Sequence, residues 1–141
     1  MNVVDANVLL YAVNVDADHH DEARGWLDES LSGAATVGFS WIVLLAFLRL
    51  STKVALFPHP LAPSDALDRV DAWVSAPTAV IVEPTSRHLS VVRALLADVG
   101  TGGNVVNDAH LAALSLEHRG GVVTYDHGFG RFPDVSWRPP G

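Results

Sequence analysis

The chain has 141 residues, of which 49% are hydrophobic and none is cysteine, so we expect one domain over residues 1–141, without disulfides or a thiolate zinc site. A formal charge of −7 argues against a protein that coats nucleic acid non-specifically, although a metal-filled carboxylate cluster would be locally cationic. The most apolar stretch, Ser40 to Leu50, is too short for a membrane span, and the N-terminus lacks the basic, apolar and small-residue zones of a secretory signal, so we expect a cytoplasmic protein.

Short apolar runs alternate with helical patterns in the first half of the chain. Strands are expected at residues 2–5 and 35–39. Three helices are expected: residues 7–13, a helix capped by Asp18 that ends at Gly33, and an apolar helix that Ser40 caps and that ends near Thr52.

The second half begins with three prolines between residues 54 and 63, which predict an exposed loop. Helices are expected from a cap at Ser64 to Val74, over residues 86–99, and from Asn104 to Arg119 after a glycine turn. Strands are expected at residues 79–83, 122–125 and, more briefly, 135–137.

Strands separated by helices predict an α/β fold with parallel pairing, right-handed crossovers and helices on both faces of the sheet. Ligands of such sheets bind at the carboxyl ends of the strands. That edge is therefore where candidate functional residues are sought.

Three aspartates are candidates for a shared site. Asp5 follows the first predicted strand and Asp126 follows the fourth, so the two converge if those strands are neighbours. Asp108 lies in the first turns of the helix from Asn104, at the border of its apolar face. Each acid taken alone is equally well read as a helix cap or a turn former.

Converging carboxylates repel one another and raise a pKa unless a cation lies between them. Oxygen ligands of this kind select Mg²⁺ or Mn²⁺ over zinc. The chemistry that such a site favours is phosphodiester hydrolysis, in which the metal activates water and stabilises the displaced oxygen.

Three segments resemble a known family. The opening Met1-Asn2-Val3-Val4-Asp5-Ala6-Asn7 resembles the start of a PIN domain, residues 107–114 (NDAHLAAL) resemble the segment of its third acid, and residues 124–133 (TYDHGFGRFP) resemble its closing motif. Their order and spacing run over nearly the whole chain. Residues 40–49 (SWIVLLAFLR) and 57–61 (FPHPL) are similar to one subgroup of VapC toxins.

The resemblance implies a three-layer α/β/α sandwich with a mostly parallel sheet of four or five strands. It also implies a Mg²⁺-dependent endoribonuclease that forms a homodimer and is inhibited by a VapB-type antitoxin. Asp5, Asp108 and Asp126 would hold the metal, and Asn7 would position ligands or water.

Two departures from the family pattern affect the metal count. The usual glutamate of the helix after the second strand is interpreted as Phe47, and no Asp or Glu occurs between Ser30 and Ser64. The second acid of the closing motif is Gly128. One metal instead of two, weak binding, or loss of catalysis would each be compatible with these changes.

Other polar residues have a plain interpretation beside a functional one. Asn104 is either a helix cap or, with its glycine neighbours, a place where RNA approaches, and Arg49 either forms a structural ion pair or contacts phosphate. His110 is interpreted as a polar surface residue that could also assist Asp108. His19 and His20 point in different directions on a helix and are interpreted as structural.

Three functions remain open at this stage. The first is an active metal-dependent endoribonuclease. The second is a catalytically degenerate PIN fold that binds RNA or an antitoxin, and the third is an aspartyl-phosphate phosphohydrolase. The third ranks last, because such enzymes need an acid two residues after the first Asp and this chain has Asn7 there.

Overall fold

The computed structural model describes residues 1–54, 57–100 and 102–141, and its centre is a five-stranded sheet. The strand order is β3-β2-β1-β4-β5, and every neighbouring pair is parallel. The strands are β1 (Asn2–Val4), β2 (Val37–Phe39), β3 (Ala79–Ile81), β4 (Gly121–Val123) and β5 (Trp137–Arg138). The predicted parallel sheet is confirmed, with β1 at its centre.

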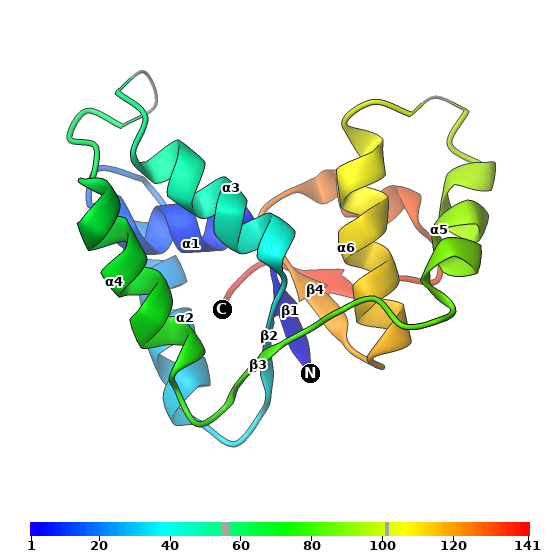
Figure 1. The fold of residues 1–141 in the computed structure, drawn as a ribbon, viewed down its shortest axis with the longest axis horizontal. Helices are drawn as coiled ribbons and strands as arrows, with labels where there is room; N and C mark the ends of the chain where they lie inside the picture. Colours follow the sequence, from blue (N-terminus) through cyan, green and yellow to red (C-terminus); the bar gives the residue numbers. More distant parts are fainter. Residues whose placement is uncertain (55–56, 101) are drawn as a thin grey trace.

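Helices cover both faces of this sheet (Figure 1). One layer contains α1 (Ala6–Val13), α2 (His20–Ser32), α3 (Trp41–Ser51) and α4 (Pro63–Val74). The other contains α5 (His88–Ala97) and α6 (Val105–Glu117), while η1 (His127–Arg131) is a short 3-10 helix between β4 and β5. The predicted three-layer α/β/α sandwich is therefore confirmed.

The core lies where the sheet meets both helical layers. Val3 and Val4 of β1 are fully buried, as expected for a central parallel strand with both faces covered. Phe47 of α3 is also fully buried and packs edge-on against Trp73 of α4, with ring centroids 4.8 Å apart. These contacts fix the positions of β1 and α3, the two elements that border the candidate site.

Helix starts differ from the expected caps at three places. Ser40 does cap α3, accepting from the Val43 amide at 3.4 Å, but α2 begins one residue later than a cap at Asp18 allows. Helix α4 begins at Pro63, whose fixed φ suits the first helical position, so Ser64 is already inside the helix. Asn104 has helical backbone angles and no side-chain cap bond, because a capping side chain requires an extended backbone at that position.

The loop predicted for residues 54–63 includes positions 55 and 56, which lie outside the described residues. Among the residues that the structure does describe, none belongs to a helix with the length and hydropathy of a membrane span.

Candidate active site

Asp5 stands at the carboxyl end of the central strand. Its amide continues the ladder by donating to the Val123 carbonyl of β4 at 3.0 Å. Its side chain is the N-cap of α1, with Oδ1 accepting from the Ala6 amide at 2.7 Å. The carboxylate is thus held by the strand behind it and the helix ahead of it.

A polar network joins Asp5 to the end of β4. The Thr124 hydroxyl donates to Asp5 Oδ2 at 2.7 Å, and Asn7 Nδ2 donates to the same oxygen at 3.3 Å and to Thr124 Oγ1 at 3.1 Å. Asn7 Oδ1 accepts from the Tyr125 amide at 3.1 Å. Asn7 therefore orients the first acid and the segment that carries Asp126, although it is not itself an acid.

Asp108 faces Asp5 across a small cavity. The cavity has a volume of about 100 Å³ and lies between α3 and α6. Its polar lining consists of Asp5, Asn107 and Asp108, and its apolar lining consists of Ala6, Ile42, Val43, Ala46 and Leu111. Two of the three predicted acids therefore share one pocket at the carboxyl edge of the sheet.

Asp126 lies beside this pair but is more exposed. Its Oδ1 accepts from the Gly128 amide at 2.8 Å, so the side chain is the N-cap of η1. Its amide donates to Thr124 Oγ1 at 2.9 Å, which links it to the Asp5 network. Asp126 therefore does act as a helix cap, the role expected of a single Asp at this position, and it also lies near the other two acids.

The charges of the three acids act on one another. Burial raises the pKa of Asp5, opposed by the hydrogen bonds from Thr124 and Ala6, and the Asp126 charge raises it further. Burial also raises the pKa of Asp108 to about 6, with contributions from Asp126 and Asp5, while Arg131 opposes the rise. Both carboxyls therefore sit where a nearby cation would stabilise the ionised form.

The donor set fits a hard divalent cation. Asp5 and Asp108 both offer carboxylate oxygens to one cavity, and no hydrogen bond from a described residue contributes to the pKa of Asp108. Within residues 1–54, 57–100 and 102–141, however, no three His, Cys, Asp or Glu side chains are already grouped to hold an ion. The arrangement is a carboxylate pair with Asp126 nearby, and not a preformed cage of three acids.

The structure corrects the position interpreted as the missing glutamate. Phe47 points into the core and does not line the cavity, whereas Ala46 does. The helical face that packs on Trp73 is therefore different from the face that meets the acids. The absence of an acid on α3 stands, and Ala46 is an α3 residue that lines the cavity where such an acid would reach the carboxylates.

The two tentative positioning residues lie outside this cavity. Asn104 is exposed at the start of α6, and Arg49 is exposed in the last turn of α3, one turn beyond Ala46. The ion pair interpreted for Arg49 is not found among the described residues. His19 and His20 are structural in their contacts: His19 stacks on Tyr125 at 4.3 Å, and His20 Nδ1 bonds the Tyr11 carbonyl at 2.9 Å.

A second polar cluster was not predicted from the sequence. Glu117 Oε2 bonds His88 Nδ1 at 2.5 Å, and His88 Nε2 bonds His110 Nδ1 at 2.9 Å. Thr85 donates its amide and its hydroxyl to Glu117 Oε1 at 3.0 and 2.6 Å. The interpretation of His110 as a polar surface residue is therefore wrong, because it is half-buried against α5.

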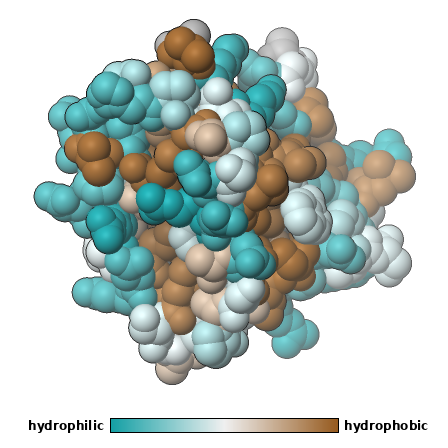
Figure 2. Space-filling view, turned by 60° about the vertical axis from the view of Figure 1, so that its left-hand side comes forward, coloured by the Kyte–Doolittle hydropathy of each residue, from teal (hydrophilic) through white to brown (hydrophobic). Residues whose placement is uncertain are grey.

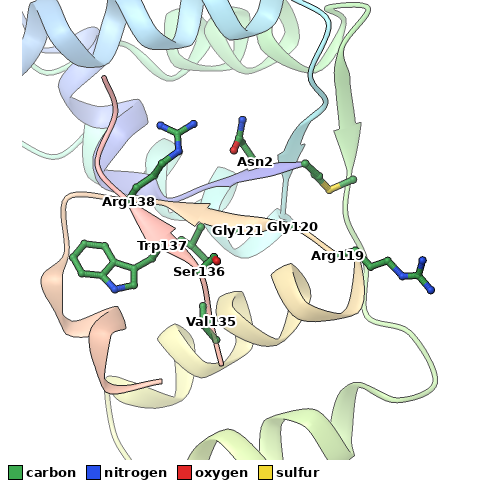
Figure 3. A pocket seen from close by; sticks show the side chains of 10 residues that line it. Asn2, Arg119, Gly120, Gly121, Val135, Ser136, Trp137 and Arg138 are labelled. Atoms are coloured by element: carbon green, nitrogen blue, oxygen red, sulfur yellow. The ribbon is translucent and has the colours of Figure 1, made fainter. Parts of the chain in front are cut away.

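A larger cavity lies at the opposite edge of the sheet (Figure 3). It has a volume of about 710 Å³ and is lined by the starts of β1, β4 and β5, including Asn2, Gly121 and Trp137. Its lining contains arginines but no carboxylate. A search for the site by cavity volume alone would therefore miss Asp5 and Asp108, which line the smaller cavity.

A parallel α/β/α sandwich with acids at the carboxyl ends of its central strands defines a class, and comparison with known proteins gives the family. The PIN domain family model matches residues 3–135, and the chain belongs to that family. The chain is 56% identical to Ribonuclease VapC37 of Mycobacterium tuberculosis over 140 residues, covering 99% of this chain and 97% of that protein. It is 39% identical to VapC ribonuclease Mb2897 of Mycobacterium bovis, covering 99% and 95%.

Within the PIN family the chain is a VapC-type toxin ribonuclease, which confirms the resemblance given by its sequence motifs. A solved structure supports the fold: VapBC2 of Rickettsia felis, bound to a DNA fragment from its promoter, has a chain that matches with a TM-score of 0.72. That match has 20% sequence identity and covers 99% of this chain and 98% of the other.

Proposed function

We propose that the chain is a Mg²⁺-dependent endoribonuclease, with Mn²⁺ as an alternative ion, and that Asp5, Asp108 and Asp126 carry its site. The observation that supports this most directly is the cavity that Asp5 and Asp108 line together at the carboxyl edge of the sheet. The raised pKa values of both carboxyls support the same conclusion, because they arise from burial and from nearby negative charge that a divalent cation would compensate.

Asp5 and Asp108 would bind the ion directly, with water completing its shell, and Asp126 would add negative charge from the side. When bound, such an ion supplies a water of lowered pKa and stabilises negative charge on the phosphate. Thr124 and Asn7 hold Asp5 Oδ2 in a fixed orientation, so their role is to position the ligand. The apolar side chains of Ile42, Val43 and Leu111 restrict water on the other sides of the cavity.

Replacement of the acids tests this proposal. Asp5→Asn and Asp108→Asn should each abolish cleavage of total RNA in the presence of Mg²⁺, while circular dichroism shows an intact fold. Asp65→Asn is the matched control, because Asp65 is an exposed acid in the first turn of α4. Retained cleavage in either site variant, or cleavage that persists with excess EDTA, would contradict the assignment.

Asp126 should behave differently from the other two acids. Because its charge raises the pKa of both Asp5 and Asp108, Asp126→Asn relieves repulsion in the metal-free protein. Metal affinity, measured by calorimetry, should therefore fall more than stability, measured by urea unfolding. Unchanged affinity would remove Asp126 from the site.

Ala46 and Gly128 favour a second candidate, a PIN fold that binds RNA or a partner without cutting. Ala46 leaves the α3 side of the cavity without a carboxylate, Gly128 replaces the second acid of the closing motif, and a three-acid cage is absent from the described part of the chain. A Mg²⁺ titration by calorimetry combined with an RNA cleavage assay separates the two candidates. Metal binding together with metal-dependent cleavage supports the first candidate. The absence of both metal binding and cleavage supports the second candidate.

The VapC type of the chain also suggests its substrate, its inhibitor and its assembled state. We propose RNA as substrate, a VapB-type antitoxin as inhibitor, a homodimer as the assembled state and the cytoplasm as location. Hydrophobic side chains reach the surface on the side of the molecule where α3 and α4 lie (Figure 2). Trp41 and Leu45 of α3 are 52% and 58% exposed, which supports an interface with a second copy. Light scattering of the wild type and of Leu45→Asp tests the dimer.

A further inference from the structure

The closing segment carries an arginine close to the acids. Gly128 and Arg131 are three residues apart in η1, and residues at this spacing in a 3-10 helix lie one above the other. A Cβ atom built on Gly128 would lie 2.6 Å from Arg131 Nη2 and 2.9 Å from Asp126 Oδ1. The Arg131 guanidinium therefore occupies the space in which a side chain at position 128 would begin.

One acid of the proposed site lies at the same point. Asp126 caps η1 through its Oδ1, the atom that is 2.9 Å from the Cβ position of Gly128. The guanidinium, 2.6 Å from that position, therefore lies beside the acidic cluster.

This guanidinium is available to a ligand. Arg131 is exposed, and among the residues that the structure describes it takes part in no ion pair. It also lines a separate cavity of about 280 Å³ between α5 and the segment after η1. An arginine has five N–H donors in a planar fork that matches the oxygens of a phosphate.

We propose that Arg131 binds a backbone phosphate of the RNA beside the acidic site, and that Gly128 provides the space for it. The inference rests on the proposed ribonuclease function. The glycine at position 128 then does more than remove a metal ligand, because it allows the Arg131 guanidinium to face the substrate. The net charge at this edge becomes more favourable for a polyanion.

Binding of a short fluorescein-labelled single-stranded RNA of mixed sequence, measured by anisotropy over a salt series in an Asp5→Asn background, tests the phosphate contact. Arg131→Gln should weaken binding about tenfold and reduce the slope of log K against log salt by about 0.7, the value for one phosphate contact on a single strand. Arg131→Lys should retain most of the slope. Arg69→Gln is the matched control, because it removes the same charge from the exposed face of α4 and should leave the slope unchanged.

Gly128→Ala provides an independent arm. It adds no charge, but its methyl group displaces the guanidinium, so it should lower RNA affinity as Arg131→Gln does. Combined with Arg131→Gln it should have no further effect, since both changes remove one interaction. In the active enzyme, each single change should raise KM for RNA more than it lowers kcat.

The outcomes separate the two proposals. If Asp5→Asn abolishes cleavage but Arg131→Gln and Arg69→Gln bind RNA with the same affinity and salt slope, only the role of Arg131 is wrong. If the Asp5→Asn protein still cleaves RNA, the proposed active site fails whatever Arg131 does. Additive effects of Gly128→Ala and Arg131→Gln would overturn the coupling between these two positions.

Discussion

The Thr124 hydroxyl donates a hydrogen bond of 2.7 Å to Asp5 Oδ2, joining the ends of the neighbouring strands β1 and β4. Thr124 Oγ1 in turn accepts from the Asp126 amide at 2.9 Å and from Asn7 Nδ2 at 3.1 Å. Thr124 is fully buried, so its one donor and both acceptor positions are used inside the protein. The Thr124 side chain thus aligns Asp5 with the segment that carries Asp126.

Thr124→Val should damage both stability and the site. It keeps the shape of the side chain but leaves the partners of the hydroxyl unsatisfied in a buried place, at a cost of about 2–3 kcal/mol. Urea unfolding measures this loss, and calorimetry should show weaker Mg²⁺ binding because Asp5 loses its orientation. Thr124→Ser, which retains the hydroxyl, should restore metal affinity. Equal metal affinity in the Val and Ser variants would show that the hydroxyl does not position Asp5.

Asp108 gives the metal-free protein a defined pH dependence. Its folded pKa is raised from 3.8 to about 6, so the folded state binds a proton more tightly than the unfolded state between these values. Its contribution to stability is therefore present below pH 3.8 and is lost as pH rises through about 6. Because the side chain is partly exposed and screened, we expect a loss on the order of 1 kcal/mol.

Urea unfolding in EDTA at pH 4 to 7 of the wild type and of Asp108→Asn isolates this contribution, since the variant lacks it. The stability of the variant relative to the wild type should increase over that range. Saturating Mg²⁺ should oppose this trend, because it stabilises the ionised carboxylate of the wild type and has no such ligand in the variant. A difference that stays constant with pH in EDTA would contradict the raised pKa.

Ala46→Glu should strengthen metal binding. Ala46 lines the cavity of Asp5 and Asp108, so a carboxylate there adds an oxygen ligand to the existing pair. We expect Mn²⁺ and Mg²⁺ affinity to rise about tenfold, roughly 1.4 kcal/mol. In EDTA the same variant should be less stable at neutral pH, because a further negative charge joins the cluster.

Two controls accompany this change. Ala46→Gln adds nearly the same volume without charge, and Gly25→Glu adds the charge at an exposed position of α2 outside the cavity. Calorimetry should find tighter binding only for Ala46→Glu. An equal gain from Gly25→Glu would mean that general electrostatics, and not an added ligand, is responsible.

The predicted convergence of Asp5 and Asp126 has a geometric basis. Asp5 and Asp126 each follow a short apolar strand, and parallel strands end at the same edge of a sheet, so their convergence depends only on β1 and β4 being neighbours. The alternation of strands and helices predicted the three layers in the same way. The local sequence pattern was sufficient wherever the hydrophobic period and the order of elements along the chain determined where a residue lies.

Contacts between side chains on different helices could not be obtained in this way. Whether Ala46 or Phe47 faces the acids depends on the rotation of α3, which is fixed by the packing of Phe47 on Trp73. The bond between His88 and His110 depends on how α5 packs on α6. The position of Arg131 could likewise not be predicted, because its proximity to Asp108 arises from the 3-10 turn after β4.

Glu117 explains why α5 and α6 are joined by a polar cluster, and it leads to a prediction on stability. Its side chain is completely buried. Burial alone would raise its pKa, but the hydrogen bonds from Thr85 and His88 and the charge of His88 outweigh burial and lower it. The ionised carboxylate is thus stabilised in the folded state, and this stabilisation is present above pH 4.5 and is lost as pH falls through the lowered folded pKa.

His110 adds to the loss of stability in acid. Burial and the nearby His88 lower its pKa from 6.5, so the folded state disfavours its protonated form. Stability therefore declines as pH falls below 6.5, and Glu117 extends the decline to lower pH. The trend is opposite in sign to that of Asp108, so Asp108→Asn is the background in which to measure it.

Glu117→Gln should lower the free energy of unfolding at pH 7 by about 2–3 kcal/mol, because it replaces charge-assisted hydrogen bonds by neutral ones in a buried place. Glu29→Gln, at an exposed position of α2, should change it by less than about 0.5 kcal/mol. The loss for Glu117→Gln should shrink toward pH 4 as the wild-type carboxylate approaches its own protonation. If urea midpoints of the two variants coincide at pH 7, the buried cluster does not stabilise the packing of α5 on α6.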